Sequence, residues 1–143
     1  MQRIKITIPT TFTFTCTLPV TINTINYGNH VGNDAFFAYA HNARIQWLKT
    51  IGYTELNING LGLIMLDASI QYLTQVHHGS LLHIGINIAQ ISQNGFTLIY
   101  YFECENEAKT IKKAAIIESN LLFFNYTTQK IAETPEEFKI KCQ

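Results

Sequence analysis

Charged side chains are scarce in this chain: Asp, Glu, Lys and Arg make up only 14% of its 143 residues. About a quarter is usual in soluble domains, so we expect a partner subunit to cover part of the surface. The ten basic residues balance the ten acidic ones. Bulk electrostatics therefore predicts neither a nucleic acid nor an acidic membrane as a partner, and the shortage of charge favours a homo-oligomer.

Signals for export, membrane insertion and metal binding are also missing. The amino terminus, MQRIKITIPT, alternates polar and apolar residues and lacks the hydrophobic segment of a signal peptide. No uninterrupted apolar run is long enough to span a bilayer. The cysteines, Cys16, Cys104 and Cys142, have no metal-ligand spacing. We expect a cytoplasmic protein with reduced cysteines, two of them buried.

The length is that of one domain, large enough to keep a core without a disulfide or metal. No internal repeat, linker or low-complexity segment interrupts the sequence. We expect a single domain over residues 1–143, with residues 1–10 as an N-terminal arm and residues 128–143 as a polar, peripheral tail.

One stretch has the periodicity of a long amphipathic helix that ends near Ile51. Asn33 is a good N-cap residue, Asp34 follows in the first turn, and Gly52 is placed to cap the far end. Asn42, Gln46 and Lys49 form the polar side. The apolar side repeats at helical spacing and consists of Phe36, Phe37, Ala40, Ala43, Trp47, Leu48 and Ile51.

The loop before this helix, residues 27–32, contains Gly28 and Gly32. Glycines allow tight turns and the close approach of a ligand to main-chain N–H groups, and at a helix N-terminus such groups can polarise a carbonyl oxygen. The alternative is that the two glycines only turn the chain.

The remaining segments alternate like strands, and Asn94-Gly95 is a strong hairpin signal. The expected strands run over 12–22, 63–76, 82–88, 96–104 and 110–126, with Phe12 and Phe14 on the same face of the first. One strand, a long helix and four further strands predict an α+β fold, in which an antiparallel five-stranded sheet wraps around the helix. A single such layer leaves a sheet edge open, which again favours a dimer.

The order of these features is similar to that of the hotdog-fold acyl-CoA thioesterases of the 4-hydroxybenzoyl-CoA thioesterase type. The resemblance covers nearly the whole chain and is carried by YGNHVGND before the helix, by the strand GLIMLDASIQY, by the Gln93-Asn94-Gly95 hairpin and by the strand LLFFNY. It implies a homodimer or homotetramer that acts on an acyl-CoA or an acyl carrier protein. Coenzyme A is then part of the substrate, and no other cofactor is implied.

In that family the segment before the helix typically reads Asp-x-Asp-x-x-Gly-His-Val-x-Asn, and its second Asp acts as general base or nucleophile. His30, Val31 and Asn33 match this pattern, but Thr24 and Asn26 stand at the two Asp positions. A Glu that is common in the middle of the family's helix is also absent. An amide has no basic oxygen at neutral pH, so Asn26 cannot be a simple general base.

The catalytic candidates are therefore Asn26, His30, Asp34 and Asp67. We expect N–H groups between His30 and Asn33 to polarise the thioester carbonyl, and His30, Asp34, Asp67 or a group of the partner subunit to activate water. Each has a structural alternative: His30 fixes the loop, Asp34 complements the helix dipole, and Asp67 points to solvent. The substrate-binding candidates are Tyr27, Gly28, Val31, Gly32 and Asn33.

These residues favour a thioester hydrolase with an altered catalytic set. The loss of both motif carboxylates favours the alternative, a hotdog protein that binds acyl thioesters without hydrolysing them. The dehydratases and hydratases of this fold usually present His in a Gly-His-Phe-Pro context, whereas His30 is followed by Val31 and Gly32, so this class ranks last.

Overall fold

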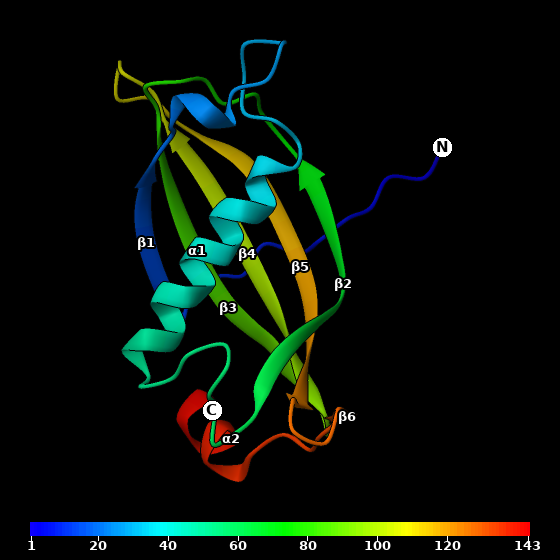
Figure 1. Cartoon of the computed structure of the whole chain (residues 1–143). Coiled ribbons are helices and arrows are strands. Elements are labelled where there is room, and N and C mark those ends of the chain that lie inside the picture. Colours follow the sequence, from blue (N-terminus) through cyan, green and yellow to red (C-terminus); the bar gives the residue numbers. More distant parts are fainter.

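An antiparallel sheet curves around one long helix, α1 (Ala35–Thr50), which lies across one of its faces (Figure 1). The computed structural model describes all residues, 1–143. A 3₁₀ turn, η1 (Ile22–Thr24), precedes α1, and a short helix, α2 (Glu136–Cys142), ends the chain. The strands are β1 (Phe14–Pro19), β2 (Gly62–Tyr72), β3 (Leu81–Ile91), β4 (Gly95–Glu105), β5 (Ile111–Asn125) and β6 (Lys130–Ile131). The predicted α+β fold is confirmed.

The strand order is β1-β3-β4-β5-β2, with β6 paired to β5, and every neighbouring pair is antiparallel. The hairpin predicted at Asn94-Gly95 joins β3 to β4. Strands β1 and β2 flank α1 in the sequence and form the two edges of the sheet. The helix therefore carries the chain from one edge to the other, and one side of β2 is left without a neighbouring strand.

The prediction of five strands was wrong, because the sheet has six. The sixth, β6, contains only two residues, Lys130 and Ile131, which pair with Asn125 and Phe124 of β5. Two residues cannot show an alternating pattern, so only the tertiary pairing reveals this strand.

The first strand, β1, is shorter than predicted. The residues just before it point to the opposite face of the sheet from the one expected. Phe14 packs against the main core, but Phe12 stacks on Tyr101 on the opposite face of the sheet, with ring centroids 5.9 Å apart. The main chain therefore turns over between these residues, and the expected common face was wrong. All three cysteines are free, but only Cys104 is buried; Cys16 is half-buried because β1 is an edge strand.

Helix α1 begins at Ala35, one residue later than predicted. Asp34 rather than Asn33 is the N-cap residue, and no side chain caps the helix by a hydrogen bond. Gly52 follows the helix with φ of +82°, as expected for a helix-ending glycine. Neither helix combines the length and apolarity that crossing a membrane would take.

The main core lies between α1 and the sheet, and the carboxyl-terminal tail is part of it. Phe138 of α2 is completely buried, and its ring centroid lies 4.8 Å from that of Phe96 and 5.1 Å from that of Phe123. Trp47 of α1 packs on the same ring. The expectation of a peripheral tail is thus wrong for α2. One aromatic side chain of this polar segment, Phe138, packs in the core against residues of the sheet.

The amino-terminal residues run behind the sheet and project beyond the β2 edge (Figure 1). Ile6, Ile8 and Phe12 cover a small second cluster on the outer face, formed by Ile99, Tyr101 and Ile116. This segment has no strand of its own. It protects apolar side chains that the face opposite α1 would otherwise expose.

Candidate active site

Hydrogen bonds within the loop before α1 hold it in a compact turn. The Asn26 N–H donates to the carbonyl oxygen of His30 over 2.9 Å, and the Asn26 Oδ1 accepts from the Gly28 N–H over 2.9 Å. A Cβ on Gly28 would lie 2.9 Å from the His30 Nε2 and 3.2 Å from the Asn26 Oδ1. Glycine at this position therefore lets the His30 ring and the Asn26 amide lie beside each other.

Two of the backbone donors expected to polarise a substrate are already used. The Val31 N–H donates to the Val76 carbonyl oxygen over 2.8 Å, and the Gly32 N–H donates to that of Thr24 over 2.9 Å. The prediction was wrong for these two groups, since they tie the loop to the rest of the fold. The N–H groups of His30 and Asn33 have no acceptor within the chain.

A cavity of about 370 Å³ opens between this loop and the segment that follows β2. The loop and the first turn of α1 supply polar and apolar groups on one side, and residues 72–76 form the other. Its lining is His30, Val31, Asn33, Phe36, Tyr72, Leu73, Thr74, Gln75 and Val76. Three of the nine candidates from the sequence, His30, Val31 and Asn33, therefore meet here, and the two free N–H groups belong to lining residues.

Tyr72 connects the two sides of this cavity by a hydrogen bond. The sequence did not indicate this residue. Its hydroxyl donates to the Asn33 carbonyl oxygen over 2.8 Å, across 39 positions of the chain. Burial raises the pKa of Tyr72, and the negative charge of Asp34 raises it further. The phenol therefore stays a donor at neutral pH. No local pattern marks Tyr72, because its partner is a main-chain atom distant in sequence.

The other candidates lie outside the cavity. Asp34 is exposed at the start of α1, and Tyr27 is fully exposed. Asp67 lies beside a bulge in β2, where its Oδ1 accepts from the Asn120 Nδ2 over 2.7 Å. Five residues of strand, about 16 Å, separate it from Tyr72. Within one chain, Asp67 does not join the loop.

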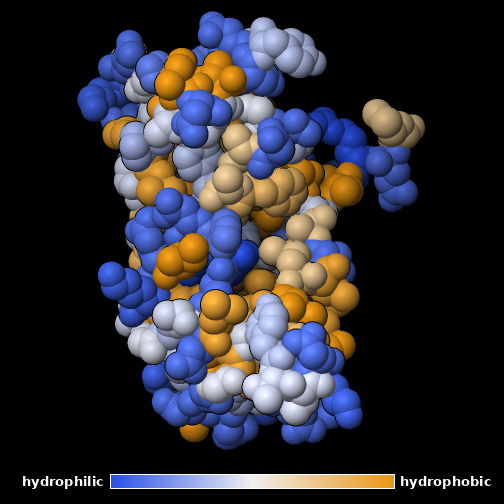
Figure 2. All heavy atoms as spheres, in the orientation of Figure 1, coloured by the Kyte–Doolittle hydropathy of each residue, from blue (hydrophilic) through white to orange (hydrophobic).

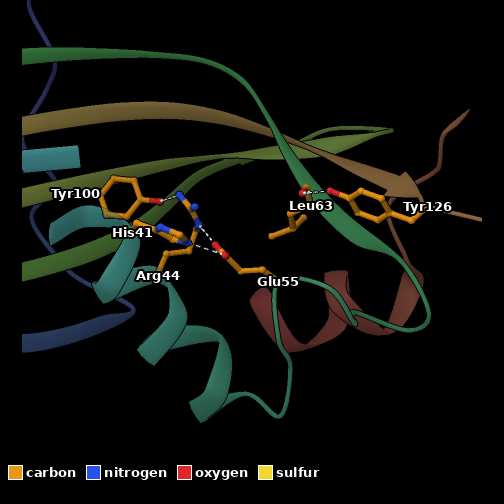
Figure 3. Close-up of polar contacts among 6 residues, drawn as sticks. All are labelled: His41, Arg44, Glu55, Leu63, Tyr100 and Tyr126. Carbon is orange, nitrogen blue, oxygen red and sulfur yellow. Dashed lines mark hydrogen bonds and ion pairs between the residues drawn. The ribbon is translucent and has the colours of Figure 1, made fainter. Parts of the chain in front are cut away.

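A second polar cluster was also missed by sequence reasoning: a buried arginine network on the side of α1 that faces β2 (Figure 3). The Arg44 Nε donates to the Glu55 Oε1 over 2.6 Å, and its Nη1 donates to the Tyr100 hydroxyl over 3.1 Å. The second Glu55 oxygen lies 2.7 Å from the His41 Nε2. Arg44 falls at a core-facing helical position, so periodicity alone did not indicate a charge-paired residue there.

The Glu55 carboxyl is expected to make stability depend on acid pH. Burial raises its pKa, but hydrogen bonds from His41 and Arg44 outweigh burial and hold the pKa below the ordinary 4.5. The contribution of the ionised carboxylate to stability is therefore complete above pH 4.5 and is lost as pH falls through the lower folded-state value.

Urea unfolding of the native protein and Glu55→Gln at pH 6 and pH 3 checks this expectation. The difference between their free energies of unfolding should shrink at pH 3. A constant difference would contradict a role for the Glu55 charge.

We compared the chain with models of known protein families and with curated proteins. The family model of the Thioesterase-like superfamily matches residues 20–141. A search of curated proteins found no match.

Solved structures share this fold at low sequence identity. The 4-hydroxybenzoyl-CoA thioesterase of Pseudomonas sp. strain CBS-3 is 11% identical with a TM-score of 0.82, covering 92% of this chain and 100% of its own. A hypothetical protein from Staphylococcus aureus in complex with CoA is 19% identical with a TM-score of 0.77, covering 90% and 80%. A 1,4-dihydroxy-2-naphthoyl-CoA thioesterase from Synechocystis is 20% identical with a TM-score of 0.73, covering 90% and 94%.

Proposed function

The chain belongs to the thioesterase-like superfamily and has its hotdog fold, and from this premise we propose that it hydrolyses an acyl thioester, releasing coenzyme A or a carrier protein. One observation carries the proposal: the N–H groups of His30 and Asn33, which both line the cavity at the start of α1, lack acceptors within the chain. The positive end of the helix dipole strengthens such donors. A thioester oxygen that gains negative charge during attack fits this position.

His30 is the proposed acceptor for the proton of the attacking water. Its Nδ1 lies 3.2 Å from the Val31 carbonyl oxygen. Because a carbonyl oxygen only accepts, Nδ1 carries a hydrogen, and in the neutral imidazole Nε2 keeps the lone pair that takes the proton. Tyr72, the other titratable residue of the lining, is a phenol with a raised pKa and cannot serve as a base near neutrality.

The proposed reaction balances without a further reactant. The water oxygen bonds to the thioester carbon while His30 Nε2 takes a water proton, and the carbonyl oxygen becomes an oxyanion held by the N–H groups. The carbon–sulfur bond then breaks, and the thiolate receives the proton from the imidazolium. This scheme needs no cofactor and uses neither Asp34 nor Asp67.

Asn26→Asp is expected to raise kcat at least tenfold, because a carboxylate beside His30 supplies a second base. One carboxylate oxygen can still accept the Gly28 N–H, so the loop conformation should survive. The measurement is steady-state hydrolysis of the best thioester substrate. Asn23→Asp, an equal charge change on the exposed η1, is the control. An unchanged or lower rate in Asn26→Asp would show that a carboxylate at position 26 does not act on the attacking water.

The alternative function is binding of an acyl thioester without turnover. It is favoured by the amide at position 26, whose oxygen is committed to the Gly28 N–H. Release of free thiol from short, long and aromatic acyl-CoA substrates tests the two functions. Turnover supports the hydrolase, whereas saturable acyl-CoA binding without thiol release supports the binding protein.

Homodimerisation through the open edge of β2 is the second part of the proposal. Unpaired main-chain groups of an edge strand can be satisfied by a second strand, and a two-fold axis makes such pairing self-complementary. Met65 and Leu66, exposed by 46% and 61%, lie on this strand. Figure 2 shows apolar atoms gathered over β2 at the right-hand margin of the helix-bearing face. A tetramer, a carrier-protein substrate and a cytoplasmic location stay predictions.

A further inference from the structure

The side of α1 that faces β2 carries large apolar side chains, although it lies away from the core. Phe37 and Ile45, at four-residue spacing from His41, are exposed by 37% and 48%. Ile45 also lines a groove with Leu56, which is 73% exposed. We call Phe37, His41, Ile45 and Leu56 the α1 flank. Three of these four side chains are apolar and one can hydrogen-bond, and Lys49, Tyr53, Thr54 and Glu55 add polar groups to the groove beside them. Apolar side chains with a few polar groups are the usual composition of a small-molecule site.

His41 is held in a fixed orientation on this wall. Its Nε2 bonds to Glu55, whose other oxygen is held by Arg44, and Arg44 is anchored in the core on the Tyr100 hydroxyl (Figure 3). A solvated surface pair would have no such buried anchor. The network therefore positions the imidazole, even though its side chain is 51% exposed.

The partner of the His41 Nε2 determines what its other nitrogen can bind. A carboxylate accepts hydrogen bonds only, so Nε2 carries a hydrogen, and in the neutral imidazole Nδ1 then keeps a lone pair. No group of the chain bonds to this Nδ1. The α1 flank therefore offers an acceptor to a ligand and selects for a donor such as a hydroxyl.

The direction of β2 determines which cavity the α1 flank serves. The Leu63 N–H donates to the Glu55 carbonyl oxygen over 2.8 Å, which places Glu55 and His41 beside the amino end of β2. The cavity with His30 lies at the carboxyl end of the same strand, beyond Tyr72. Antiparallel pairing of two β2 edges brings the carboxyl end of one strand beside the amino end of the other. The cavity of one subunit then faces the α1 flank of the next.

We propose that His41 of the partner subunit, fixed by the partner's Glu55, lines the acyl end of the site and selects acyl groups that carry a hydroxyl. This inference rests on the proposed hydrolase and its β2-paired dimer. His41 acts as a specificity-determining residue, and His30 remains the proton acceptor. Phe37 and Ile45 supply the apolar contacts for the rest of the acyl group.

Matched substrates test the selectivity of His41. The ratio of kcat/KM for hydroxybenzoyl-CoA to that for benzoyl-CoA is measured in the native protein and in His41→Leu. We expect His41→Leu to lower this ratio about tenfold or more, because a hydrogen bond to the ligand is lost. Hydrolysis of benzoyl-CoA should change less than threefold. Asn42→Leu, the same replacement at the adjacent exposed position, is the control and should leave the ratio unchanged.

A mixed dimer tests the contribution across the two-fold axis. One subunit carries His30→Ala and the other His41→Leu, and two affinity tags isolate the mixed species. If His41 serves the cavity of its partner, one site of the mixed dimer is intact and about half of the native activity on hydroxybenzoyl-CoA returns. If His41 served its own chain, neither site would be intact and activity would be about half of that of His41→Leu.

Several outcomes would overturn the inference. These are an unchanged substrate ratio in His41→Leu, equal losses on both substrates, no recovery in the mixed dimer, or a monomer in solution. If the native protein hydrolyses no thioester, the proposed function fails separately. The selectivity of His41 is then read from calorimetric affinities for hydroxybenzoyl-CoA and benzoyl-CoA, where loss of the hydroxyl preference in His41→Leu supports it and retention overturns it.

Discussion

Replacing His30 with alanine is expected to lower kcat for thioester hydrolysis by about 100-fold or more, the usual effect of removing a positioned proton acceptor. The ring lies in the cavity at the start of α1, and its Nδ1 contact with the Val31 carbonyl leaves Nε2 to accept a proton. The N–H donors are main-chain groups, so they remain in the variant. KM should therefore change much less than kcat. Steady-state kinetics on the best acyl-CoA substrate measures both constants.

The control for His30→Ala is His78→Ala, the same replacement at an exposed position next to a turn. Its rate should stay within twofold of the native rate, and circular dichroism should show that both variants keep the native fold. Full activity in a folded His30→Ala would mean that another group accepts the proton. The hydrolytic scheme would then lose its base, while the N–H donors would still account for carbonyl binding.

Replacing Phe138 with alanine is expected to lower the free energy of unfolding by about 3–5 kcal/mol, the usual effect of emptying an aromatic core position. Its ring contacts the rings of Trp47, Phe96 and Phe123, which come from α1, β4 and β5. The cavity left behind would lie between the helix and the sheet, where backbone on both sides limits collapse. Since domains of this size are stable by about 5–15 kcal/mol, the effect is large.

Equilibrium urea unfolding followed by tryptophan fluorescence measures this loss, since the single Trp47 packs directly on Phe138. Ile140→Ala on the same short helix is the control, because Ile140 is 67% exposed and should cost no more than about 0.5 kcal/mol. Equal stabilities of Phe138→Ala and the native protein would show that α2 is not part of the folded core in solution.

Several features could be predicted from the sequence because their signals are local. The alternation of β3 and β4, the Asn94-Gly95 turn between them and the end of α1 at Gly52 each depend on residues within one element. The site loop was found for the same reason, since its glycines, His30 and Asn33 are consecutive with the helix start. Local chemistry also showed that Asn26 lacks the basicity of a carboxylate.

The features that the sequence did not predict arise from contacts between distant residues. The burial of Phe138, the bond from Tyr72 to Asn33 and the use of the Val31 N–H by Val76 join segments far apart in the chain. Arg44 shows the same limitation: its charge is compensated by Glu55 and Tyr100, which no helical pattern can indicate.

By itself, the sequence determined the α+β class, the long helix and the loop that carries His30, because the periodicity of polar and apolar residues and turn chemistry act over a few residues. Only the tertiary structure decided which N–H groups remain free, that residues 72–76 form the second wall of the cavity, and that Glu55 orients His41. These outcomes depend on the β2–β5 register and on the path of the connection after α1. Hydrogen bonds and burial between distant segments form only when the whole chain has folded.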